Sequence, residues 1–199
     1  MLLDLIQTRA GGFLAGALTV AIILAAATPA RAQGFISPIF GFNFGGVSGC
    51  PELNGCEDKQ KNFAIGFGKF GTIFGAETEL SYSPKFFGDA PGLSSNVFTW
   101  MGNVMLAPKA GPVRPYLTFG TGIMKTHFTL DTASLLTFND TALGYNVGGG
   151  IVALFGDHFG IRGDLRYFHS FPDVTILFIT LPSEKLNYSR ISAGMVLQF

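Results

Sequence analysis

The chain has 199 residues, and its 13 basic and 13 acidic side chains give a formal net charge of zero. Only 13% of the residues are charged, against about 25% in a typical soluble domain, and no basic stripe is present, so we expect no nucleic-acid partner. Outside the amino terminus the apolar residues alternate with small or polar ones, which favours the wall of a membrane β-barrel over a globular core or a helical bundle.

The first 32 residues have the features of a cleavable signal peptide. Arg9 precedes an apolar run from Phe13 to Ala27, and Ala30 and Ala32 are the small residues that a signal peptidase requires. A membrane-anchor helix is the alternative, but such a helix needs roughly 20 apolar residues and this run is shorter. We therefore predict a signal peptide over residues 1–32 and a barrel domain over residues 33–199.

Two cysteines, Cys50 and Cys56, lie in a short segment that also contains Pro51 and Gly55. Because export places them in an oxidising compartment, we predict that they form a disulfide that holds a loop. A metal site is the alternative, but the sequence has no second cysteine pair and no histidine close by. We expect neither a bound metal nor a cofactor.

Eight segments show the alternation of a β-strand with one oily face. They are Gly34–Gly45, Asn62–Lys69, Ile73–Ser83, Val97–Leu106, Arg114–His127, Leu143–Phe155, Gly160–His169 and Tyr188–Phe199. Long connections, at Val47–Lys61, Lys85–Asn96, Thr129–Thr141 and Phe171–Asn187, alternate with short ones. This rhythm predicts an all-β fold, an eight-stranded antiparallel up-and-down transmembrane barrel, with its long loops outside the cell and both termini in the periplasm.

The carboxy-terminal strand shows the alternation most clearly. Ile191, Met195, Leu197 and Phe199 share one face, and the residues between them are mostly small or polar. Since the sequence ends on the aromatic Phe199, we expect this strand to close the barrel against the first one.

Charged residues fall on the strand faces opposite the large apolar residues. A charged side chain facing lipid costs about 2–4 kcal/mol for Arg or Lys at the middle of the bilayer, so these residues are expected to face the lumen. The predicted lumen charge network consists of Glu77, Glu79, Asp164, Arg114, Arg162, Arg166 and Arg190. On the exterior, aromatic residues such as Tyr82, Trp100 and Tyr145 are expected to form girdles at the membrane interfaces.

An eight-stranded barrel is just wide enough for its interior side chains to fill it, and opposite charges buried there are expected to pair. We therefore interpret the lumen charges as a salt-bridged plug. A narrow gated pore, opened when arginines exchange their glutamate partners, is the alternative. A soluble lipocalin-like barrel is a further alternative that requires the reverse arrangement, with large apolar residues inside and charges outside.

Three segments, Arg114–Gly122, Leu143–Ile151 and Gly160–Phe168, together with the terminal Phe199, resemble the outer-membrane β-barrel domain family, the small OmpA-like and OmpX-like barrels of Gram-negative bacteria. The resemblance implies a place in the bacterial outer membrane, in contact with lipid and lipopolysaccharide. It also implies that the barrel-assembly machinery reads Ile191, Met195, Leu197 and Phe199 as its signal.

The family is diverse in function, and we expect a structural or adhesion-like role in which the surface loops contact a surface partner. Some eight-stranded barrels modify lipid A with a histidine, a serine and a carboxylate. His127, His158 and His169 do not assemble with such groups along the sequence. We therefore do not expect an enzyme.

Overall fold

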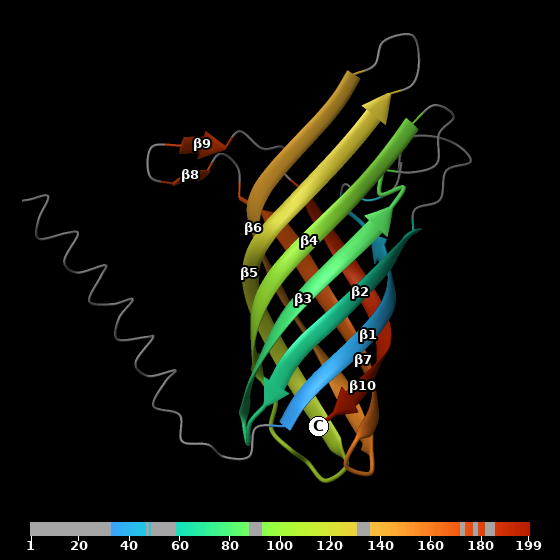
Figure 1. Cartoon of the computed structure of the whole chain (residues 1–199), viewed down its shortest axis with the longest axis vertical. Helices are drawn as coiled ribbons and strands as arrows, with labels where there is room; N and C mark the ends of the chain where they lie inside the picture. The colour runs from blue at the N-terminus through green and yellow to red at the C-terminus, as the bar shows by residue number, and fades with distance from the viewer. Residues whose placement is uncertain are drawn as a thin grey trace, which may run out of the picture. The chain divides into compact units, whose positions relative to one another are not determined.

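The structure is a computed structural model that describes residues 33–46, 48, 59–87, 93–130, 136–171, 174–176, 179–181 and 186–199. Eight strands form a closed antiparallel barrel (Figure 1). They are β1 (Gln33–Phe44), β2 (Lys59–Phe70), β3 (Phe74–Pro84), β4 (Leu93–Leu106), β5 (Val113–Leu130), β6 (Leu136–Phe155), β7 (Phe159–Ser170) and β10 (Asn187–Gln198). Two short strands, β8 (Val174–Ile176) and β9 (Ile179–Leu181), pair only with each other.

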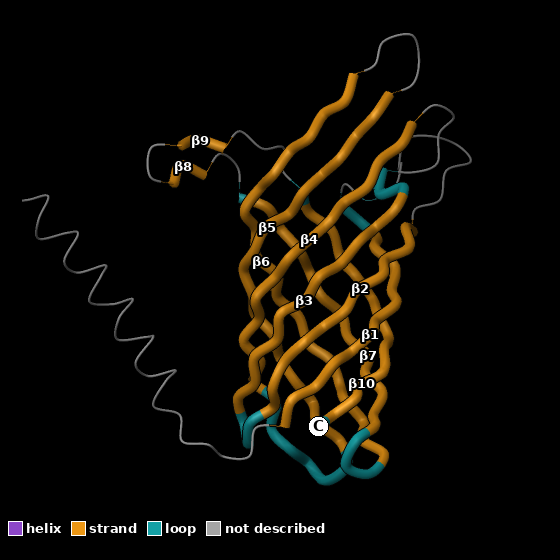
Figure 2. Tube along the Cα trace, in the orientation of Figure 1, coloured by secondary structure: helices purple, strands orange, loops and turns teal. Residues whose placement is uncertain are grey.

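Each barrel strand pairs with its neighbour along the chain, β7 pairs with β10, and β1 pairs with β10 to close the cylinder. The predicted up-and-down barrel of eight strands is thus confirmed. The described residues are all strand, turn or irregular, and they contain no helix that could cross a membrane (Figure 2). The predicted signal peptide, Cys50 and Cys56 lie outside the described residues.

Several strands are longer at one end than the sequence pattern predicted. The loop predicted at Thr129–Thr141 is wrong, because β5 continues to Leu130 and β6 begins at Leu136. Similarly, β2 begins at Lys59 and β4 at Leu93, inside two other predicted loops, and β8 and β9 lie inside the fourth. Backbone pairing continues beyond the oily band of the wall, where the alternation that marks a membrane strand is not required.

The two ends of the barrel differ. At the end where β1 begins and β10 ends, which we call the turn end, the connections are the short segments 71–73, 107–112 and 156–158. At the opposite end, the loop end, lie the connections that follow β1, β3, β5 and β7. The connections that follow β1, β3 and β7 are longer than those at the turn end, as predicted, but the connection between β5 and β6 is limited to residues 131–135.

Side chains alternate between the lumen and the exterior. Along β7, residues from Gly160 to Ser170 are buried at every second position, and most of those between them are exposed. Leu117, Leu165 and Phe42 are 64%, 52% and 37% exposed, as predicted for the oily exterior. Because Glu77 is 2% exposed and Arg166 1%, the ionic groups are inside, which is the reverse of a lipocalin-like barrel.

Two apolar clusters fill the ends of the lumen. The turn-end cluster consists of Phe35, Phe70, Met105, Ala107, Tyr116, Val152 and Val196. The loop-end cluster consists of Phe86, Val97, Met101, Met124, Phe168, Leu186 and Tyr188. Polar and charged side chains occupy the lumen between them, so the interior has three layers along the barrel.

Candidate functional site

The charged layer of the lumen draws its residues from opposite walls. Glu77 and Glu79 are on β3, while Arg162, Asp164 and Arg166 are on β7. In the barrel order, β4, β5 and β6 separate β3 from β7 on one side, and β2, β1 and β10 separate them on the other. Because side chains at every second position point inward, the two walls present opposite charges to each other across the full width of the lumen.

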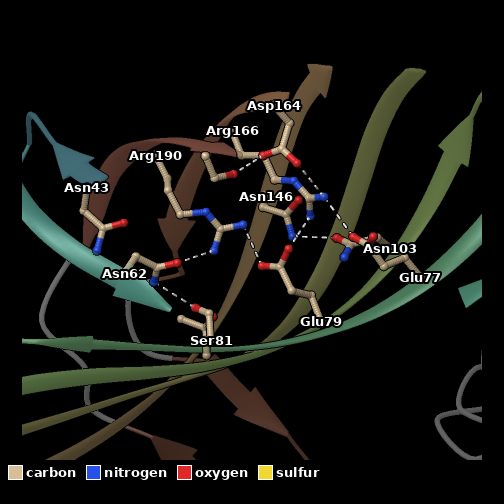
Figure 3. A network of polar contacts seen from close by, with 12 residues as sticks. Asn43, Asn62, Glu77, Glu79, Ser81, Asn103, Asn146, Asp164, Arg166 and Arg190 are labelled. Carbon is tan, nitrogen blue, oxygen red and sulfur yellow. Dashed lines mark hydrogen bonds and ion pairs between the residues drawn. The ribbon is translucent and has the colours of Figure 1, made fainter. Parts of the chain in front are cut away.

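The guanidinium groups of β7 bridge to the carboxylates of β3. Figure 3 shows Arg166 beside Glu77 and Glu79. Arg162 Nη1 lies 2.5 Å from Glu77 Oε2, and Arg166 Nη2 lies 2.8 Å from Glu77 Oε1. Arg166 Nη1 reaches the second carboxylate, 3.2 Å from Glu79 Oε2, and Arg190 Nη2 of β10 lies 2.7 Å from Glu79 Oε1. These ion pairs tie three strands together inside the barrel.

Asp164 is bound by Arg162 of its own strand and by hydroxyl groups of β5 and β10. Arg162 Nη2 lies 3.0 Å from Asp164 Oδ2, and the Tyr116 hydroxyl donates to the same oxygen at 2.7 Å. The Ser192 hydroxyl donates to Asp164 Oδ1, also at 2.7 Å. Three arginines therefore meet three carboxylates, so the formal charges of the layer sum to zero. Each of these six side chains is fully shielded from solvent.

Neutral polar side chains extend the network toward β1 and β4. Asn62 accepts from Arg190 Nη1 at 3.3 Å and donates to Ser83 Oγ at 2.8 Å. Asn43 also donates to Ser83 Oγ, at 2.7 Å. Separately from these contacts, Asn146 Nδ2 on β6 donates to Asn103 Oδ1 on β4 at 2.8 Å. These amides and hydroxyls were not among the predicted site residues, although their inward positions follow from the strand alternation.

Arg114 does not join the network to which the sequence assigned it. Its Nη1 donates to the carbonyl oxygen of Gly71 at 3.1 Å, and its guanidinium carbon lies 4.9 Å from the ring centroid of Phe70. Both partners are at the turn end. The side chain points inward as expected, but it lies near one end of the cylinder, beside the turn-end cluster.

Glycines make room for the large ionic side chains. A Cβ at Gly150 would lie 2.6 Å from Asp164 Cβ and 2.8 Å from the Tyr116 hydroxyl. At Gly148 it would approach Arg166 Cα to 2.7 Å. The inward glycines of β6 therefore leave the space that β7 fills with charge.

Apolar clusters lie on both sides of the charged layer. At the turn end the Phe35 and Phe70 rings stack with centroids 4.3 Å apart. At the loop end Tyr188 stacks on Phe168 and meets Phe86 edge-on, both at 4.9 Å. Arg190 lies against this cluster, with its guanidinium carbon 4.9 Å from the Phe168 centroid. Packed rings thus cover the ion pairs at each end.

The histidines lie apart from this network. His158 is in the turn between β6 and β7, and His169 contacts Tyr145 and Tyr167 on the exterior, with centroids 5.5 and 6.3 Å apart. In the described part of the chain, no group of histidine, cysteine or acidic side chains has the arrangement of a metal site. The charged network binds the strands β3, β7 and β10 together inside the barrel.

The four predicted residues of the barrel-assembly signal are on the exterior. Ile191, Met195, Leu197 and Phe199 are 55%, 50%, 47% and 75% exposed. Their strand forms the closing seam with β1, in which Ile36 faces Leu197 and Phe42 faces Ile191. An oily stripe therefore runs along the last strand to the turn end.

Comparisons with known proteins agree with this architecture. Residues 15–199 match the family model described as outer membrane protein beta-barrel domain. Among solved structures, neisserial surface protein A (NspA) is similar, with 14% identity, a TM-score of 0.63, and coverage of 83% of this chain and 97% of that chain. The attachment invasion locus protein Ail of Yersinia pestis has 14% identity, a TM-score of 0.54, and coverage of 84% and 99%. A comparison with curated proteins found no match.

Proposed function

The chain belongs to the outer membrane protein beta-barrel domain family and lies in the bacterial outer membrane, and from this premise we propose that it is a closed, non-conducting barrel that presents an interaction surface at its loop end. The loop end faces the outside of the cell in this proposal. Lipid surrounds the oily exterior, and the protein acts through structure and contact.

The side chains that fill the lumen support the proposal. A path for ions would have to cross the turn-end cluster, the charged layer and the loop-end cluster in turn. In the charged layer, Arg166 lies between Glu77 and Glu79 and touches both. Ions crossing a dry cluster lose their hydration, which costs far more than thermal energy.

The loop end supports the second half of the proposal, because its strands rise above their neighbours. Pairing between β6 and β7 stops at Gly144 and Ser170, where Phe171 donates a last hydrogen bond to Leu143. Strands β5 and β6 continue as a paired hairpin to Leu130 and Leu136, and β4 follows them as far as Leu93 (Figure 1). The parts of β4, β5 and β6 that extend past this point do not contribute to anchoring the barrel in the membrane. They are therefore available for contact with another cell or protein.

Trimming this hairpin tests the surface role. Thr126 and Asp140 face each other in the ladder, so an Asn-Gly turn that joins them removes residues 127–139 without disturbing the pairs below. Vesicles carrying the protein are expected to adhere to host cells or to neighbouring bacteria, and the trimmed variant is expected to lose that adhesion. Asp157→Ser, in an exposed turn at the other end, serves as the control. Equal adhesion of the trimmed and untrimmed proteins contradicts the surface role.

A narrow gated pore is the second candidate. Arg166 contacts two carboxylates at 2.8 and 3.2 Å, so an exchange of partners within the layer is geometrically simple. Planar-bilayer recordings separate the two functions. The closed barrel predicts no steady current, whereas a current that changes with Glu77→Gln or Arg162→Gln establishes the pore. Release of acyl chains from lipopolysaccharide in the same preparations would instead establish an enzyme.

A further inference from the structure

Among the buried charged residues that the structure describes, Arg114 alone has no opposite charge beside it. The three arginines of the charged layer pair with three carboxylates, whereas Arg114 forms no ion pair with a described residue. Its side chain is nevertheless enclosed, and the residue is 5% exposed. Its neighbours are the Phe70 ring, the carbonyl oxygen of Gly71 and, across the ladder, Val152. An uncompensated buried charge is costly, so this end of the lumen favours an anion.

The hydrogen-bonding groups of Arg114 are only partly used. Nη1 donates to the Gly71 carbonyl oxygen at 3.1 Å, while the buried Nε has no partner among the described residues. The Nε groups of Arg162, Arg166 and Arg190 also lack partners, but carboxylates already balance the charges of those side chains. Arg114 therefore needs both an acceptor and a negative charge. A single oxyanion supplies both.

Gln198 adds a second donor at the same end of the lumen. It is the last residue of β10 and is 4% exposed, and its Nε2 has no partner among the described residues. It is the ladder partner of Phe35, whose ring stacks on that of Phe70 with centroids 4.3 Å apart. Since the guanidinium of Arg114 contacts the same Phe70 ring, the two donors flank one aromatic stack.

We infer that Arg114 and Gln198 form a binding site for a carboxylate group at the turn end of the lumen. The guanidinium donates through Nε and the amide donates through Nε2, so one ligand group satisfies both donors. A carboxylate carries one negative charge and matches the one charge of Arg114. A phosphate monoester carries about −1.5 to −2 at pH 7 and exceeds it. The site is separate from the proposed surface role, because it lies at the opposite end of the barrel.

Lys109 provides a contrast at the same end. It lies in the connection 107–112 and its side chain is exposed. Water and salt screen an exposed ammonium group, so its attraction for anions is weak and unselective. It also lacks the planar fork with which a guanidinium binds both oxygens of a carboxylate. Lys109→Gln therefore removes a positive charge from the turn end and leaves the inferred site intact.

The test uses the isotope-labelled protein folded in micelles of an uncharged detergent. Nuclear magnetic resonance follows the Nε–H signal of Arg114 and the side-chain amide of Gln198 during titrations with sodium acetate and, at equal ionic strength, with sodium chloride. The Arg114 signal is assigned by its absence from Arg114→Lys. Acetate is expected to shift both signals along one saturable curve, and chloride is expected to leave them in place.

The variants then apportion the binding. In Arg114→Gln, observed through the Gln198 amide, the dissociation constant for acetate is expected to rise at least about tenfold. Arg114→Lys keeps the charge and loses the fork, so a smaller rise is expected. In Gln198→Leu, observed through the Arg114 signal, the expected rise is about fivefold, as for one neutral hydrogen bond. Lys109→Gln is expected to bind acetate like the wild type.

Two ligands distinguish the sources of the carboxylate. Acetate represents small free carboxylates, and the dipeptide alanyl-alanine represents the carboxy terminus of a peptide. Tighter binding of the dipeptide assigns the site to peptides, whereas equal or weaker binding assigns it to small carboxylates. The amide of the dipeptide has no carboxylate and is expected not to bind.

Three results overturn the inference. They are an acetate shift no larger than the chloride shift, an Arg114→Gln or Gln198→Leu variant that binds acetate like the wild type, and inorganic phosphate that binds more tightly than acetate. Heat-modifiable migration on gels verifies that each variant is folded, and Gln198→Leu still decides the matter if Arg114→Gln does not fold. The adhesion and conductance experiments leave Arg114 and Gln198 unchanged, so failure of this site and failure of the proposed function are separate outcomes.

Discussion

The hydroxyl of Ser37 donates a hydrogen bond to the carbonyl oxygen of Met195 across the closing seam, with an Oγ to O distance of 2.7 Å. Gly34 and Phe199 exchange both of their backbone hydrogen bonds, at 3.1 and 2.9 Å. Such pairs recur at every second residue of an antiparallel ladder, so Pro38 occupies a position where a backbone N–H would face Met195. Proline has no N–H, and the neighbouring hydroxyl satisfies the carbonyl in its place.

Ser37→Ala is therefore expected to destabilise the barrel by about 1 kcal/mol, because it leaves a partly buried acceptor without a donor. Urea unfolding from lipid vesicles measures the loss. The double variant Ser37→Ala/Pro38→Ala restores the N–H and is expected to recover most of the stability. If the second substitution gives no recovery, the hydroxyl does not substitute for the missing ladder bond.

The alternation of oily and small residues was enough to predict which face of each strand points outward. It correctly oriented Leu117 and Leu165 toward the exterior and Glu77 and Arg166 toward the lumen. Orientation is a local property with a period of two residues, so it can be read within one strand. The predicted closure between the first and last strands rested on the pattern of the last strand and is confirmed by the pairing of β1 with β10.

Partners across the lumen could not be predicted in the same way. Whether Arg162 meets Glu77 depends on the registers of all the hairpins between β3 and β7, because each one shifts the height of the next strand along the barrel. Arg114 illustrates the consequence: it points inward as predicted, but its height places it beside Phe70 and Gly71. The ends of β5 and β6 were missed for a different reason, since outside the membrane no oily face marks the strand.

Arg166 is the most connected cation of the charged layer, and its removal is expected to be the most damaging. Arg166→Gln leaves Glu79 with Arg190 alone and deprives Glu77 of one of its two arginines. Breaking a buried ion pair costs about 3–5 kcal/mol, and we expect a loss of that size in urea unfolding. Arg114→Gln, which also removes an inward arginine but from outside the network, is the matched control and is expected to cost much less. Equal losses for the two variants contradict a coupled network.

Gly150→Ala tests how tightly β6 and β7 pack inside the lumen. The new methyl group would overlap the Gly163 carbonyl oxygen and would lie 2.6 Å from Asp164 Cβ and 2.8 Å from the Tyr116 hydroxyl, so the backbone of β7 has to shift away from β6. Overpacking of this kind costs about 1–3 kcal/mol. Gly102→Ala is the control, because a methyl group there meets nothing closer than 3.9 Å. Unfolding midpoints in urea are expected to fall for Gly150→Ala and to stay near the wild-type value for Gly102→Ala.

Phe199 is expected to matter for assembly in the cell more than for the stability of the folded barrel. Its backbone exchanges two hydrogen bonds with Gly34, and Phe199→Ala keeps both, while its side chain is 75% exposed. Refolding of Phe199→Ala into detergent is therefore expected to match the wild type. If the exposed ring is part of the signal that the assembly machinery reads, the amount of folded protein in the outer membrane falls several-fold in cells. Leu106→Ala, on the exterior at the same end and 44% exposed, is the control. An equal yield in cells for all three proteins removes Phe199 from the proposed signal.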